Sequence, residues 1–185
     1  MVGSMNSPLK EFIVALERRE PPLDLPFLTQ ACVQRHVVGH LAILTPPYLE
    51  KILSGEKTIE SRFSRSRSVP FEKVHGGDLI LLKETAGPLC AVAVAASVRC
   101  FGPLGPGEAE RLMEVYQTEL QLEQDFKSAK QHSLYATLIT LRDVLPIKPI
   151  QVKKVDRRPW VVLTENNGNG VTHNSFERMM VGKNG

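Results

Sequence analysis

The sequence has 185 residues, of which 42% are hydrophobic, 23% are charged and 13 are glycine. This composition is that of an ordinary folded domain, and it excludes a disordered, collagen-like or low-complexity chain. The formal net charge of +3 permits a nucleic-acid partner without requiring one.

The first 36 residues predict an extension that is separate from the main domain. Ser7 and Pro8 suit the start of a helix, and the apolar residues that follow share one stripe, so we expect a helix over 7–20. Residues 21–36 read as an irregular linker. We therefore expect a helical extension and linker at 1–36, a main domain at 37–165 and a flexible Asn/Gly-rich tail at 166–185.

The main domain opens with a strand, a short helix and a second strand. Residues 37–45 are rich in β-forming residues, 47–54 carry an apolar stripe that ends before Gly55, and 57–63 alternate in polarity. Later strands are expected at 79–83, 89–100, 133–144 and 159–164, with Pro146 and Pro149 breaking the third of these, and a helical segment is expected at 108–130.

Five or six strands with three helices, and no regular strand–helix–strand alternation, predict an α+β fold. Short strands of differing direction favour a small, partly open β-barrel. The longest mainly apolar run, 88–98, is too short to cross a membrane, which needs about 20 residues, so we expect no membrane association.

The near-neutral total hides an uneven distribution of charge. Residues 57–73 and 148–158 are each basic, whereas 108–125 are mostly acidic. A basic segment indicates an anionic partner such as nucleic acid, and the acidic segment indicates a possible basic protein partner.

The informative stretch is GEKTIESR at 55–62, which follows the short helix and opens a strand. Gly55 allows the helix to end in a left-handed conformation and turn tightly. Glu60 and Arg62 are two residues apart on a strand, so they project from the same face. Lys57 joins them only if it still belongs to the turn, because a strand would direct it to the opposite face.

This GxKxxExR pattern resembles the motif of the ASCH domain, a family related to the PUA-like RNA-binding barrels. The resemblance covers residues 41–98 by motif and extends to 163 by the order of elements. It implies a PUA-like barrel and an RNA, nucleotide or modified-nucleoside ligand. Some bacterial ASCH proteins resemble amidohydrolases of N4-acetylcytidine, or ribonucleases. Lys57 matches the motif lysine of those amidohydrolases, but a threonine stands in them where this chain has Glu60.

Charged side chains on a strand are also compatible with an ordinary surface ion-pair ladder. Against that alternative, the helix, the glycine and the family pattern together favour a pocket. The expected ligand-binding residues are Lys57, Glu60, Arg62, Thr45, Tyr48 and Lys83, of which Lys57 and Glu60 would be catalytic in an enzyme. The expected nucleic-acid-binding residues are Arg65, Arg67, Lys153, Lys154, Arg158 and Trp160.

Other kinds of site find little support. Three cysteines without a CxxC pair argue against a disulfide framework and a cysteine zinc site, and the histidines are scattered, so we expect no metal and no cofactor. No secretory signal is evident, and we expect a cytoplasmic protein. Three functional hypotheses stay open: RNA or nucleotide binding, hydrolysis of an acylated base or of RNA, and a protein-interaction module that uses the acidic 108–125 segment.

Overall fold

A computed structural model describes Arg18, residues 37–152 and residues 158–163. The expected helix at 7–20, the linker and the C-terminal tail lie outside the described residues, apart from Arg18. Within the described ranges, none of the helices is long and apolar enough to cross a membrane.

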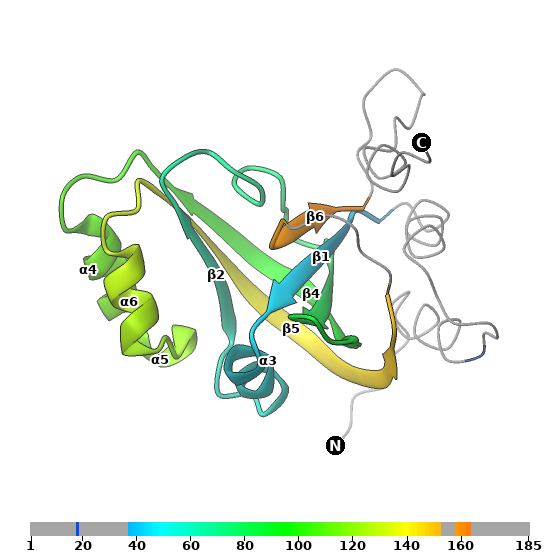
Figure 1. Ribbon diagram of the computed structural model, residues 1–185. Coiled ribbons are helices and arrows are strands. Elements are labelled where there is room, and N and C mark those ends of the chain that lie inside the picture. The colour runs from blue at the N-terminus through cyan, green and yellow to red at the C-terminus, as the bar shows by residue number, and fades with distance from the viewer. Residues whose placement is uncertain (1–17, 19–36, 153–157, 164–185) are drawn as a thin grey trace, which may run out of the picture.

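Six strands form one sheet, in the order β2-β5-β4-β3-β1-β6. The sheet curls strongly, so that β1 and β2 face the same side in Figure 1. Only β1 and β3 run parallel, and every other pairing is antiparallel. The strands are β1 (Gly39–Leu44), β2 (Ile59–Ser64), β3 (Leu79–Glu84), β4 (Leu89–Phe101), β5 (Tyr135–Ile150) and β6 (Trp160–Val162). The fold is therefore α+β with a partly open barrel, as the sequence predicted.

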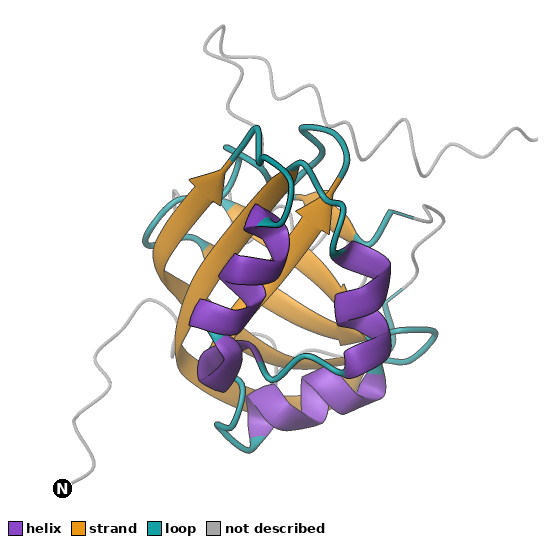
Figure 2. Ribbon diagram, turned by 90° about the vertical axis from the view of Figure 1, so that its left-hand side faces the viewer, coloured by secondary structure: helices purple, strands orange, loops and turns teal. Residues whose placement is uncertain are grey.

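Four helices are described, and Figure 2 shows helices gathered in front of the curled sheet. They are α3 (Pro46–Leu53), α4 (Glu108–Val115), α5 (Gln117–Leu120) and α6 (Gln124–Lys130). The helical segment expected at 108–130 is thus three short helices. Tyr116 leaves the helical region at the end of α4, and Gln121 ends α5 in a left-handed conformation with φ 49°.

Strand β5 corrects the expected strand end at the prolines. It runs from Tyr135 through Pro146 and Pro149 to Ile150. Its pairing with β2 covers only 135–140, whereas its pairing with β4 continues to Ile150 with register shifts. The N–H of Leu141 still donates to the carbonyl of Thr58, but beyond it the described residues pair with the strand on the β4 side only. A proline is tolerated there because its missing N–H can face the side without a partner strand.

Both faces of the central strands are buried. Alternate residues of β1 and β3, such as Leu41 and Leu81 on one face and Ala42 and Ile80 on the other, belong to two separate apolar clusters. Helix α3 contributes Leu49 and Ile52 to the second cluster. A third cluster joins β2 and β5 to α4 and α5. Packing in this third cluster, through Ile59 and Phe63, fixes the position of β2, on which the candidate site is built.

A buried polar chain crosses the sheet beside the second cluster. The indole Nε1–H of Trp160 donates to Nδ1 of His40 at 3.3 Å, and Nε2 of His40 lies 3.0 Å from Oδ2 of Asp78. Since an indole N–H can only donate, Nδ1 of His40 accepts, and its proton therefore lies on Nε2, which donates to Asp78. The backbone N–H of His75 also donates to Oδ2 of Asp78, at 2.7 Å.

We predict that Asp78→Ala lowers the free energy of unfolding by about 1–3 kcal/mol, because the buried donor of His40 loses its acceptor. Urea unfolding followed by the fluorescence of Trp160, the single tryptophan, measures the change. Glu114→Ala removes an exposed carboxylate on α4 and serves as the control, with an expected effect within about 0.5 kcal/mol. Equal effects of the two substitutions would contradict a structural role for the hydrogen bonds that link Trp160, His40 and Asp78.

Candidate functional site

The turn between α3 and β2 places Lys57 where a strand would not. Gly55 adopts φ 82°, and the backbone N–H of Lys57 donates to the carbonyl of Lys51 in α3 at 2.9 Å. Strand β2 begins only at Ile59. Lys57 therefore belongs to the turn, and its side chain lies on the same side as Glu60 despite their spacing.

The ammonium group of Lys57 is almost fully buried. Its side chain is 1% exposed, and Nζ donates to the carbonyls of Ile59 at 2.6 Å and Leu120 at 2.8 Å. Nζ also lies 3.8 Å from Oε2 of Glu60. Burial lowers the pKa of Lys57 to about 8, although the Glu60 carboxylate opposes that shift, and the Arg62 guanidinium adds to it. The amine is thus nearer to neutrality at physiological pH than an ordinary lysine.

Glu60 binds a second cation through its other oxygen. Oε1 of Glu60 lies 2.9 Å from Nε of Arg62, and the Glu60 side chain is only 4% exposed. The Nε–H bond is not directed at this oxygen, so the contact is an ion pair, and Nε is a buried nitrogen without a hydrogen-bond partner among the described residues. One buried carboxylate therefore lies between two cations.

Arg62 bridges the open seam of the barrel. It projects from β2, at one edge of the sheet, and its Nη2 donates to the carbonyl of Ile43 in β1 at 3.0 Å. Its guanidinium carbon lies 5.1 Å from the centre of the Trp160 ring in β6, a cation–π arrangement. The hydrogen bonds from Asp78 through His40 to Trp160 therefore hold the ring against which the Arg62 guanidinium packs.

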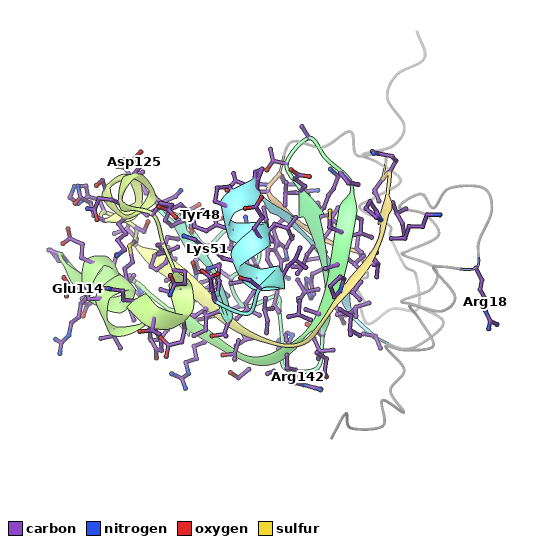
Figure 3. The ribbon with its side chains drawn as sticks, turned by 90° about the horizontal axis from the view of Figure 1, so that it is seen from below. Arg18, Tyr48, Lys51, Glu114, Asp125 and Arg142 are labelled. Carbon is purple, nitrogen blue, oxygen red and sulfur yellow. The ribbon has the colours of Figure 1, made fainter. Side chains whose placement is uncertain are left out.

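A pocket of about 420 Å³ opens at this seam. Lys57, Glu60 and Arg62 line it together with two aromatic residues, Tyr48 and Phe126. The two rings meet edge to face with 5.8 Å between centroids, and Nζ of Lys57 lies 5.6 Å from the centre of the Tyr48 ring. Figure 3 shows Tyr48 on the side of α3 that is turned toward α6.

Tyr48 is fixed by its phenol as well as its ring. The hydroxyl oxygen accepts from the backbone N–H of Glu123 at 3.3 Å, and burial raises the pKa of the phenol. The pocket thus combines an aromatic wall with buried, charged hydrogen-bonding groups. Such a combination suits a flat ligand with a polar edge.

Of the expected ligand-binding residues, Thr45, Tyr48, Lys57, Glu60 and Arg62 all line the pocket. Lys83 does not: it is buried, and its ammonium donates to the backbone carbonyls of Glu84 and Gly87 in the turn after β3. Burial also lowers its pKa. Lys83 therefore stabilises the turn that follows its own strand. The sequence does not distinguish this role from that of a lysine that points into the pocket.

The expected nucleic-acid-binding residues are divided. Arg158 lines the pocket, while Arg65 and Arg67 lie exposed in the loop after β2. Trp160 is 1% exposed and is therefore no open platform on which a base could stack. Lys153 and Lys154 lie outside the described residues.

The sequence did not identify Thr85, Phe126 or Lys130 as pocket residues. Phe126 and Lys130 lie within the helical segment expected at 108–130, and nothing in that segment marks them as pocket residues. The break of the segment into separate helices brings α6 against Tyr48, and no local pattern encodes that contact. Within the described ranges, no three His, Cys, Asp or Glu side chains gather as metal ligands.

The fold and site define a small α+β domain with a partly open barrel and a buried-charge pocket at its seam. The family model for the ASCH domain matches residues 43–151, which is more than half of the chain. The chain belongs to the ASCH domain family.

Solved structures with similar folds were also found. The ASCH protein from Zymomonas mobilis is 23% identical, with a TM-score of 0.49, and the match covers 61% of this chain and 73% of that chain. The N-terminal domain of McrB from Staphylothermus marinus is 13% identical, with a TM-score of 0.39, over 61% of this chain and 76% of that chain. A search of curated proteins found no match.

We predict that Lys57 titrates near pH 8 and that Glu60→Gln moves this titration to lower pH, because the lost carboxylate no longer favours the charged amine. NMR of the lysine side-chain amines against pH measures both values. Lys51 is an internal control, since its hydrogen bond to Glu123 raises its pKa above the ordinary lysine value. Titration of Lys57 at the ordinary value in the wild-type protein would contradict its burial.

Proposed function

We propose that this protein binds RNA or a nucleotide, with one nucleobase in the seam pocket. The observation that carries the proposal is the convergence of Lys57, Glu60 and Arg62 at the base of a pocket with an aromatic wall. Its volume of about 420 Å³ falls within the range of small-ligand pockets, about 300–1,000 Å³.

The chemistry of the wall and base supports a nucleobase in particular. Tyr48 and Phe126 offer apolar ring surface, and aromatic rings bind bases of any sequence through their π-faces. Arg62 lines the pocket with a guanidinium whose planar set of N–H donors suits a base carbonyl or ring nitrogen.

The loop after β2 supports contacts to a polymer backbone. Arg65 and Arg67 are exposed, and the guanidinium of Arg67 lies 5.4 Å from the Phe71 ring and 3.2 Å from Glu72. In the proposed complex these arginines bind phosphates next to the pocket. Such contacts add affinity without sequence preference and weaken as salt increases.

We predict that a labelled single-stranded RNA binds the wild-type protein, and that Lys57→Met weakens binding about 10- to 100-fold, the usual cost of losing charge-assisted hydrogen bonds. Fluorescence anisotropy across a salt series measures affinity and its salt dependence. Lys73→Met removes an exposed lysine outside the pocket and serves as the control. If the RNA does not bind at low salt, the proposal that the protein binds RNA is wrong. If Lys57→Met and Lys73→Met weaken binding equally, RNA binds but the pocket is not its site.

A second candidate is hydrolysis of an acylated base, with the neutral amine of Lys57 as general base. The amine takes a proton from the water that attacks the acyl carbon, and the resulting ammonium returns a proton to the base nitrogen as the carbon–nitrogen bond breaks. The observation that favours it is the lowered pKa of Lys57, which populates the neutral amine near physiological pH. The two carbonyl contacts of Nζ can be satisfied by the two N–H bonds of a neutral amine, so that state is compatible with the geometry.

For this candidate we predict that the protein releases cytidine and acetate from N4-acetylcytidine and that the rate rises as pH increases through about 8, because the neutral amine is the general base. Lys57→Met should reduce the rate at least about 100-fold, whereas Lys51→Met should not. Chromatography of the products measures the rate. No release of cytidine, or release that survives Lys57→Met, would rule out this role for Lys57.

A further inference from the structure

The lining of the seam pocket is strongly cationic. Four of its side chains are basic, namely Lys57, Arg62, Lys130 and Arg158, and one is acidic, Glu60. The carboxylate of Glu60 already faces both Lys57 and Arg62. An excess of positive charge concentrated in a hollow favours an anionic occupant over a neutral one.

The four cations form two groups that differ in what holds them. Lys57 is buried and Arg62 half-buried, and both are held by backbone carbonyls. Arg158 is exposed and Lys130 half-buried, and they line the pocket with the exposed Thr45 and Thr85. The second group therefore places two basic side chains in the lining, and of the two threonines Thr85 donates its hydroxyl to the carbonyl of Leu44 at 3.0 Å.

Lys130 is positioned by the aromatic wall itself. Its Nζ lies 5.9 Å from the centre of the Phe126 ring, and Phe126 in turn packs against Tyr48. The aromatic wall thus has Nζ of Lys57 near its Tyr48 ring and Nζ of Lys130 near its Phe126 ring, so a planar ring bound along the wall would lie between the two ammonium groups. A nucleotide has this order of groups: a polar base edge, a flat ring and, beyond the sugar, a phosphate.

We propose that Lys130 and Arg158 form a phosphate subsite at the mouth of the pocket, so that the protein selects a phosphorylated nucleoside over the free nucleoside. The proposal rests on the proposed function, because it requires a base in the inner part of the pocket. Two charged donors on one phosphate are expected to contribute about a 10- to 100-fold difference in affinity.

The test compares matched pairs of ligands by isothermal titration calorimetry. The probes are the four ribonucleosides, their 5′- and 3′-monophosphates, and a trinucleotide RNA without terminal phosphates. The variant is Lys130→Gln/Arg158→Gln. The control is Lys127→Gln/Arg142→Gln, since Lys127 lies on the same helix outside the pocket and Arg142 lies on β5, away from Tyr48 and α6 (Figure 3).

We expect wild type and control to bind at least one monophosphate about 10- to 100-fold more tightly than its nucleoside. In the Lys130→Gln/Arg158→Gln variant, nucleotide and nucleoside should bind equally, with the nucleoside affinity of wild type, which also shows that the variant is folded. A preference for the monophosphate identifies a terminal phosphate as the source of the anion. An equal preference for the trinucleotide identifies the backbone diester.

Two results overturn the proposal in distinguishable ways. If nucleosides bind in a manner that depends on Lys57 but phosphate adds no affinity, the phosphate subsite is wrong and the base pocket stands. If neither nucleosides, nucleotides nor the trinucleotide bind, the proposed function fails, and the subsite fails with it. A loss of phosphate preference in the control as large as in the variant would show that general surface charge, not the subsite, binds the anion.

Discussion

The candidate site depends on the buried ion pairs of Glu60. A carboxylate that is 4% exposed is stable only if cations and hydrogen bonds replace the water that it has lost. Lys57 and Arg62 supply the cations, and each is itself anchored by backbone carbonyls of other segments. Glu60 therefore fixes the end of α3, the start of β2 and the seam relative to one another, and the shape of the pocket follows from that arrangement.

The site is continuous with the core. Arg62 lies over Trp160, whose indole binds His40, and His40 in turn binds Asp78 at the far side of β1. These contacts link β2, β6, β1 and the turn before β3 across a seam that no strand pairing closes within the described part of the chain. A polar chain of this kind holds the guanidinium in position, and in the proposed complex that would reduce the ordering cost of binding.

Sequence and structure agree where a local pattern carries the information. The apolar stripe of 47–54, Gly55 and the alternation of 57–63 predicted α3, the turn and β2, and the spacing within 55–62 predicted the three charged groups. The sequence was wrong at Pro146 and Pro149, because a proline breaks a strand only where its missing N–H is needed, and neighbours decide that. The sequence also could not show that Lys83 and Trp160 are buried, since burial depends on contacts with residues that are distant in the chain.

The sequence by itself determined the α+β class and the motif, because these follow from periodicity, glycine placement and spacing over a few residues. It favoured a pocket over a surface ion-pair ladder only together with the family resemblance. Only the tertiary structure decided which other residues complete the pocket. Phe126 and Lys130 reach it from α6, about seventy residues after Glu60, and Arg158 reaches it from beyond β5. The physical reason is that the curl of the sheet brings its two edges together, and that curl arises from the packing of the whole sheet and not from any one segment of it.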